Sequence, residues 1–321
     1  YAKPTYGIAI VGWILGMAYI VWNPKGFARI ASWLVMAGQL GLSTFYLALY
    51  PARIQEPDGS ISKYETTVWL KVLVIAMLVW GVVDVLRRFR RYTSTSDIAT
   101  LLSPIAFFGL LVGLKMGTTI FPNISADDYH FGESLLGWWS YMQGAIPYID
   151  YIPAHGVIGD DLTQFLSFVF YDGSAGSIIH VGNLSIALLS FAAFLSLYYF
   201  SRSIGLAFAA IFFLTANIIW LFLIPFLCLW LSPSLRQRPE RWLLVWMVTA
   251  PLVVLGIPPQ GLLLAAASGV MAAYYAWHLW KAPRPRKLKG ILIAGVALLV
   301  LAVVTPAGIM LLGAIRYVLE N

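Results

Sequence analysis

Charged side chains are scarce in this chain: they make up 11% of its 321 residues, while 60% of the residues are hydrophobic. A soluble globular domain carries about 25% charged residues. The mean hydropathy of +0.80 excludes a soluble domain, because too little polar surface remains to face water, and lipid must be the solvent. The sequence also lacks a P-loop, a dinucleotide-binding fingerprint, a nucleophile elbow and a CxxC pair, which excludes a soluble catalytic domain built on those motifs.

Cysteine is nearly absent as well. The single Cys228 lies in an apolar run and excludes any disulfide within the chain. The formal net charge of +7 is not a nucleic-acid footprint, because the basic residues sit in short loops between apolar runs, as the positive-inside rule requires. The chain opens at Tyr1 without a methionine and stops at Asn321 after an apolar run, so we expect it to be part of a longer protein.

Apolar runs of helix length cover most of the sequence. Each is close to the roughly 20 residues that cross a bilayer core. Their length and pattern predict membrane-spanning helices at about 6–23, 29–50, 66–86, 98–120, 183–201, 204–231, 242–257, 259–280 and 290–319. A polar segment, about 121–182, interrupts the series. We therefore predict an all-α polytopic membrane protein with one large extracytoplasmic loop.

Basic residues orient these spans. The densest basic cluster places the loop after the third span in the cytoplasm, since it contains Arg87, Arg88, Arg90 and Arg91. The loop 51–65 and the segment 121–182 then fall outside. The latter, here called the acid-rich segment, has no Lys or Arg and carries seven acidic residues: Asp127, Asp128, Glu133, Asp150, Asp160, Asp161 and Asp172. This asymmetry predicts an integral protein of a bacterial inner membrane, with the acid-rich segment on the periplasmic side.

The same rule meets a difficulty later in the chain. Arg202 and Arg236 both belong inside, yet only the run 204–231 separates them, where an even number of crossings is required. Two short half-helices fit this requirement. We favour the alternative that residues are missing near Asn217, where an outside loop would join two full spans.

Two stretches within the acid-rich segment follow helical spacing and are too short to span. Their apolar positions are Leu135, Leu136, Trp139 and Met142 in the first, and Leu162, Phe165, Leu166 and Val169 in the second. Asp160 and Asp161 precede the second stretch as capping acids. Pro147, Pro153 and several glycines make the part between them non-helical. The pattern predicts two helices lying in the membrane interface, the alternative being a loop that only packs on the bundle.

The order of motifs in this segment resembles a known family. The residues in question are Asp127-Asp128-Tyr129, Glu133, Gly144, Pro147-Tyr148, Asp150 and His155-Gly156. An acidic pair at the outer end of a membrane helix, an interfacial helix, G-x-x-P-Y-x-D and a second interfacial helix resemble the first extracytoplasmic loop of GT-C glycosyltransferases. These include the protein O-mannosyltransferases and the lipid A aminoarabinose transferases. The resemblance covers about 98–205. The sequence departs from the family because three spans precede this region and because it lacks an arginine-rich outer loop.

The resemblance implies a GT-C-like bundle over 98–321, preceded by a three-span extension over 1–97. It implies transfer of a sugar from a polyprenyl-phosphate donor to a glycan, lipid or protein acceptor on the outer face. Asp127 or Asp128 would act as the base or orient the acceptor. This agrees with the chemistry, since inverting transfer needs one carboxylate to take the proton of the acceptor hydroxyl. The acceptor site would be formed by Tyr129, His130, Glu133, Tyr148, Asp150 and His155.

Three alternatives stay open at this point. His130, Glu133 and His155 are potential ligands of a divalent metal, which is the one cofactor that the sequence suggests, although hydrogen bonding among polar loop residues is the simpler account. The chain also fits a non-catalytic GT-C-like subunit of a larger membrane complex, with other membrane subunits as partners. A transporter fits less well, because it requires polar residues through the spans and inverted repeats.

Overall fold

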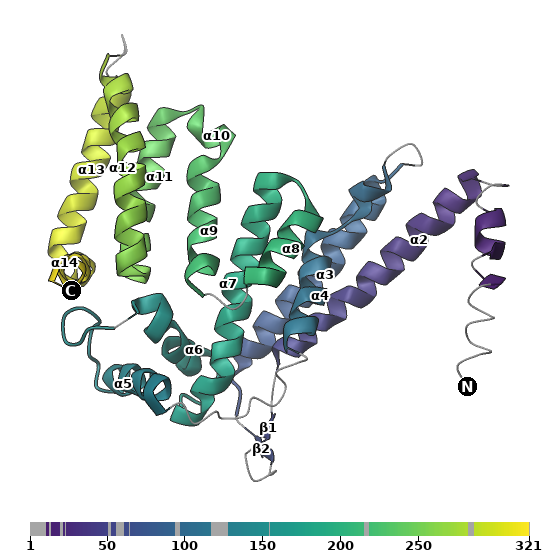
Figure 1. Cartoon of the computed structure of the whole chain (residues 1–321), viewed down its shortest axis with the longest axis horizontal. Coiled ribbons are helices and arrows are strands. Elements are labelled where there is room, and N and C mark those ends of the chain that lie inside the picture. Colours follow the sequence, from purple (N-terminus) through teal and green to yellow (C-terminus); the bar gives the residue numbers. More distant parts are fainter. Residues whose placement is uncertain are drawn as a thin grey trace. The chain divides into compact units, whose positions relative to one another are not determined.

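The computed structural model describes residues 11–12, 14–19, 22, 24–50, 53–55, 61–63, 65–93, 97–116, 128–153, 155–214, 218–281 and 286–320. Helices dominate this part of the chain (Figure 1). The one sheet within it is an antiparallel hairpin in which β1 (Arg53–Gln55) pairs with β2 (Ile61–Lys63), with Ile54 opposite Ser62.

The helices follow the apolar runs of the sequence. In chain order they are α2 (Pro24–Ser43), η1 (Thr44–Leu49), α3 (Val68–Arg91), η2 (Ile98–Leu101), α4 (Pro104–Met116), α5 (Asp128–Met142), η3 (Val157–Asp161), α6 (Leu162–Phe170), η4 (Ala175–Ser177), α7 (Ile178–Ser201), α8 (Ile204–Leu214), α9 (Ile218–Leu231), α10 (Pro233–Arg236), α11 (Pro239–Gly256), α12 (Pro258–Lys281), α13 (Arg286–Val304) and α14 (Pro306–Glu320).

Five helical stretches are long and apolar enough to cross a membrane. They are Ala28–Leu49, Val68–Arg91, His180–Ser201, Pro239–Gly256 and Pro258–Lys281. Their number and apolar character indicate an integral membrane protein, which confirms the class predicted from composition. Half of the predicted span 6–23 lies outside the described residues, and its described residues 11–12, 14–19 and 22 are helical. The run 98–120 contains the shorter α4.

The run 204–231 forms two short helices, α8 and α9. At 1.5 Å per residue their 11 and 14 residues are about 16 and 21 Å long, which is less than the roughly 30 Å of a bilayer core. Both pack on α7, and Figure 1 shows α8 turning back beside α7 and α9 running the opposite way. This is the arrangement of two half-helices, and the residues 215–217, where missing sequence was expected, lie outside the described part.

The prediction of one continuous span over 290–319 is wrong. The helix breaks at Thr305, and α14 starts at Pro306. Proline has no backbone N–H, and its ring disfavours a helical conformation of the preceding residue. Pro306 therefore accounts for the break at Thr305. Figure 1 shows α14 end-on at the foot of α13, across its direction.

The chain folds into two compact units. The first takes in the described parts of Tyr1–Ala48 and Leu73–Leu114, and the second those of Leu49–Val72 and Lys115–Asn321. The division predicted at residue 97 stays a prediction.

Buried hydrogen bonds hold the first unit together. The Gln39 side chain on α2 donates through Nε2 to the Leu101 carbonyl (3.0 Å), and its Oε1 accepts from the Ser103 amide (2.5 Å). The Tyr46 hydroxyl donates to the Ile105 carbonyl (2.7 Å). The two Gln39 bonds satisfy the Leu101 carbonyl and the Ser103 amide, which the turn between η2 and α4 leaves without a helical partner.

The core of the second unit lies among α9, α11, α12 and α13. Trp242 is fully buried there, and its indole N–H donates to the Trp230 carbonyl (2.7 Å), so its one polar group is satisfied. Gly261 lets α12 lie directly against α11, because a Cβ at that position would overlap the Val253 carbonyl oxygen.

Candidate functional site

The acid-rich segment folds as two short helices that pack on each other, α5 and α6, which confirms the two helices predicted there. Gly137 on α5 makes the close approach possible. A Cβ there would lie 3.0 Å from Asp161 Oδ1 and 3.4 Å from Gln164 Nε2. Gln164 Nε2 in turn donates to the Ser134 carbonyl (2.9 Å), which ties α6 to α5.

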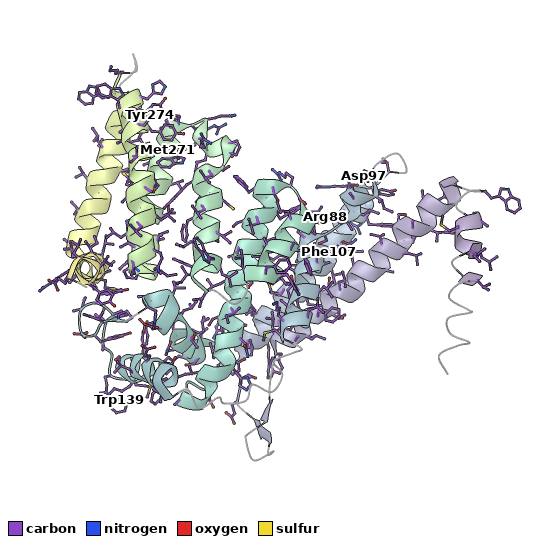
Figure 2. All side chains as sticks on the ribbon, viewed as in Figure 1. Arg88, Asp97, Phe107, Trp139, Met271 and Tyr274 are labelled. Carbon is purple, nitrogen blue, oxygen red and sulfur yellow. The ribbon has the colours of Figure 1, made fainter. Side chains whose placement is uncertain are left out.

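The outer faces of the two helices are apolar and exposed. Leu136 and Trp139 on α5 are 57% and 58% exposed, and Phe165 on α6 is 53% exposed. Figure 2 shows Trp139 projecting from α5 away from the bundle. Exposed aromatic and aliphatic side chains on a short helix are typical of helices in a membrane interface, so this face supports the predicted interfacial position.

The predicted capping of α6 by Asp160 and Asp161 is wrong. The chain enters α6 through the π-helical turn η3, and the Leu162 amide already donates to the Val157 carbonyl. Asp161 has helical backbone angles and makes no side-chain cap bond. Because η3 satisfies the first amides of α6, both carboxylates are available for other contacts.

Asp160, His155 and Glu133 form one polar cluster. Asp160 Oδ2 accepts from the His155 amide (2.7 Å), and Asp160 Oδ1 lies 3.0 Å from His155 Nδ1. Glu133 Oε2 lies 3.8 Å from the same ring nitrogen. The His155 side chain remains 58% exposed, so it can still contact a ligand. A cavity of about 50 Å³ between Glu133, Tyr151 and Asp160 has room for a few water molecules.

Asp161 borders this cavity and is fully buried. The Tyr151 hydroxyl donates to its Oδ1 (2.8 Å), whereas its Oδ2 has no hydrogen-bond partner in the described part of the chain. Burial raises the pKa of Asp161 to about 7, against the opposing effect of the Tyr151 hydrogen bond and with a smaller contribution from the charge of Asp160. Burial, and then the charge of Asp161, also raises the pKa of Tyr141 to about 12. Asp161 therefore exchanges a proton near neutral pH.

The P-Y-x-D motif forms a tight loop between the two helices. The Tyr148 amide donates to the Tyr151 carbonyl (2.7 Å), and Asp150 Oδ2 accepts from the Ile146 amide (2.7 Å). Tyr148 has a φ of 60°, a left-handed conformation that is uncommon for residues other than glycine. Its side chain is buried and its hydroxyl donates to the Leu255 carbonyl on α11 (3.3 Å), which fixes the loop on the bundle.

This loop and α14 line a half-open cavity of about 600 Å³, a volume typical of small-molecule sites. Gly313 brings α14 against the loop, because a Cβ there would lie 2.5 Å from the Tyr148 carbonyl oxygen. Of the described residues that line the cavity, Arg316 is the only basic one; its Nε lies 2.7 Å from Glu320 Oε1, and its side chain is 77% exposed. Asp150 lines the opposite wall, and Ile149, Ile152, Ile309 and Leu312 make part of the surface apolar.

The predicted site residues fall into three groups. Asp127 lies outside the described residues, and so do the side chains of Asp128, Tyr129 and His130, whose backbone forms the first turn of α5. Glu133 and His155 meet in the polar cluster. Tyr148 and Asp150 line the larger cavity.

Sequence reasoning missed two residues of this region. Asp161 was assigned to helix capping, and Arg316 was read as part of a continuous membrane span. The proline at 306 was a signal that the helix breaks before α14.

Among the described residues, no group of three or more His, Cys, Asp or Glu side chains is arranged to hold a metal ion. The His130 side chain, one of the three potential ligands, falls outside that part of the chain. The chain matches no known family in a scan of family models, and neither a curated protein nor a solved structure is significantly similar to it.

Proposed function

We propose that the chain is a membrane glycosyltransferase of the GT-C type. It would take a sugar from a polyprenyl-phosphate donor and transfer it to a glycan, lipid or protein acceptor, with the acid-rich segment on the periplasmic side of a bacterial inner membrane. The base is Asp127 or Asp128, at the start of α5. Glu133 and His155 would contact the acceptor, together with Tyr129 and His130.

The cavity of about 600 Å³ between the P-Y-x-D loop and α14 is the observation that carries this proposal. It combines one guanidinium, on Arg316 and paired with Glu320, with the carboxylate of Asp150, with tyrosines and with an apolar wall. A polyprenyl-phosphate sugar needs these three surfaces: a cation for the phosphate, hydrogen-bonding groups for the sugar and apolar side chains for the isoprenoid. Guanidinium is the side chain best suited to a phosphate because its N–H groups match two phosphate oxygens at once.

The transfer balances without a redox partner. The acceptor oxygen attacks C1 of the sugar while the carboxylate of Asp127 or Asp128 takes the hydroxyl proton. The bond between C1 and the phosphate oxygen breaks, and its electron pair leaves with the polyprenyl phosphate. Because a phosphate is a good leaving group, one carboxylate suffices, and a single displacement inverts the configuration at C1. Arg316 would stabilise the negative charge that grows on the departing phosphate.

The test uses membranes from cells that produce the full chain. Polyprenyl-phosphate mannose and polyprenyl-phosphate glucose, each labelled in the sugar, serve as donors, and the label that leaves the lipid donor for the acceptor fraction is measured. We expect Asp127→Asn or Asp128→Asn to lower the transfer rate about 100-fold or more, which is the contribution of a general base. Asp172→Asn is the matched control, because it removes the same charge from an exposed turn of the same segment.

Transfer that survives in both single variants and in the double variant would contradict the assignment of the base. A wild-type chain that moves no label from either donor, and that purifies in fixed stoichiometry with other membrane proteins, would support the non-catalytic subunit instead.

A further inference from the structure

A second large cavity lies at the other end of α7 from the acid-rich segment. It is a half-open cavity of about 690 Å³, lined by the ends of α7 and α9 and by the start of α10. Its polar lining includes Arg202, Tyr199, Ser232 and Ser234. Its apolar lining includes Leu195 and Leu229, which belong to α7 and α9. The cavity is therefore polar at one end and apolar at the other.

Arg202 supplies its positive charge. It ends α7 in a left-handed conformation (φ 59°), and its amide donates to the Tyr198 carbonyl (2.7 Å). The guanidinium lies 5.9 Å from the centroid of the Tyr199 ring, and no described carboxylate pairs with it. Two further basic residues, Arg236 and Arg238, lie at the end of α10 and directly before α11. An anion at this end of α7 would thus meet an unneutralised guanidinium.

The two serines add hydrogen-bond donors. The oxygens of Ser232 and Ser234 lie 2.9 Å apart, so one hydroxyl donates to the other and the second keeps its proton for a ligand. Leu195 lies within the candidate membrane span His180–Ser201, and Arg202 follows that span directly. The apolar end of the cavity is accordingly at the depth of acyl chains, and the polar end is at the level of lipid headgroups.

We propose that this cavity binds an anionic glycerophospholipid. Its phosphate contacts Arg202 and the hydroxyls of Ser232 and Ser234, and one acyl chain lies along Leu195 and Leu229. A free phosphate ion would satisfy the polar end and leave the apolar end uncovered, which is why a lipid fits better than the ion alone. The site is separate from the proposed transferase site and does not depend on that function.

The test measures lipid retention by the purified full chain in detergent by native mass spectrometry. Phosphatidylglycerol and phosphatidylcholine with identical acyl chains are titrated separately, and inorganic phosphate is added as a competitor. We expect tighter binding of phosphatidylglycerol, and we expect Arg202→Asn to weaken it about tenfold or more, since a hydrogen bond to a charged group is lost. Asparagine tolerates the left-handed conformation that Arg202 adopts, so the fold is preserved.

Arg241→Asn is the matched control, because it removes an exposed arginine that does not line the cavity. It should leave phosphatidylglycerol binding within about twofold of wild type. The double variant Ser232→Ala/Ser234→Ala provides a second, conservative test and should also weaken binding. Equal affinity for the two lipids, or equal losses in Arg202→Asn and Arg241→Asn, would overturn the proposal. Displacement of the lipid by millimolar phosphate would reduce the site to one for free anions.

Discussion

Replacing Asp161 by Asn removes the one carboxyl group that is fully buried among the described residues of the acid-rich segment, while keeping its size. In the wild type, burial moves the pKa of this group from 3.8 to about 7. Each pKa unit corresponds to about 1.4 kcal/mol, so the ionised carboxylate costs the folded segment about 4 kcal/mol relative to an exposed aspartate. Asparagine stays neutral, and its Oδ1 can still accept the hydrogen bond from Tyr151.

The sign of the pH dependence follows from the raised pKa. Below pH 3.8 the carboxyl is protonated in the folded and the unfolded state, and Asp161 adds no pH dependence. Between pH 3.8 and about 7 the unfolded state ionises first, so the free energy of unfolding falls as the pH rises. Above about pH 7 the carboxyl is ionised in both states, and the free energy of unfolding no longer changes with the titration of Asp161. The packing of α5 on α6 should therefore be more stable at pH 5 than at pH 8.

Hydrogen exchange of the α5 and α6 amides in lipid nanodiscs measures this difference locally. After correction for the intrinsic pH dependence of exchange, protection in the wild type should fall between pH 5 and pH 8, by up to about a hundredfold for openings that expose Asp161. Protection in Asp161→Asn should not change with pH. Tyr151→Phe should shift the transition to higher pH, because the Tyr151 hydrogen bond lowers the pKa of Asp161.

The same pH dependence in wild type and Asp161→Asn would refute the reasoning, since the change would then arise from another group. Infrared difference spectra provide an independent check. A protonated carboxyl band that disappears between pH 5 and pH 8 is expected in the wild type and should be missing from the variant.

Two further predictions concern stability and are measured by thermal unfolding in detergent. Gln39→Leu should destabilise the first unit by about 2–5 kcal/mol, because it leaves the buried Leu101 carbonyl and Ser103 amide unpaired. The control Gln143→Leu, at an exposed position, should change the free energy of unfolding by less than about 0.5 kcal/mol. Equal effects of the two substitutions would contradict this prediction. Gly261→Ala should lower the free energy of unfolding by about 2 kcal/mol or more, because the new Cβ meets the α11 backbone. Gly290→Ala, where a Cβ meets nothing within 4 Å, should instead stabilise its helix by about 1 kcal/mol. A Gly261→Ala variant as stable as the wild type would refute the close packing of α12 on α11.

Hydropathy alone predicted most of the helices, because a membrane helix must be apolar over its whole length and leaves a strong signal. The two short helices of the acid-rich segment were also predictable, since Leu135, Trp139 and Met142 keep helical spacing. Helix ends were harder. The break at Thr305 lies within a uniformly apolar run, where hydropathy does not change and only Pro306 marks the boundary.

The candidate site could be predicted only in part. Composition isolates the acidic residues, but it does not say which of them is buried. Asp160 and Asp161 look equivalent in sequence, yet one bonds an exposed histidine and the other lies beneath α5. That difference depends on Gly137, whose missing side chain admits α5 over Asp161. Arg316 could not be assigned to the site either, because its position depends on the contact between Gly313 and Tyr148, far apart in the chain.

The half-length helices α8 and α9 determine how many times the chain crosses the membrane. A hydropathy profile treats 204–231 as one crossing and so inverts the assigned side of every later helix. If the pair enters and leaves the bilayer from one face, it adds no crossing, and α11, α12 and α13 then return α14 to the face that carries the acid-rich segment. This count assigns Arg316 and Asp150, two walls of one cavity, to the same compartment. An automated topology map of this chain would instead separate them by the thickness of the membrane.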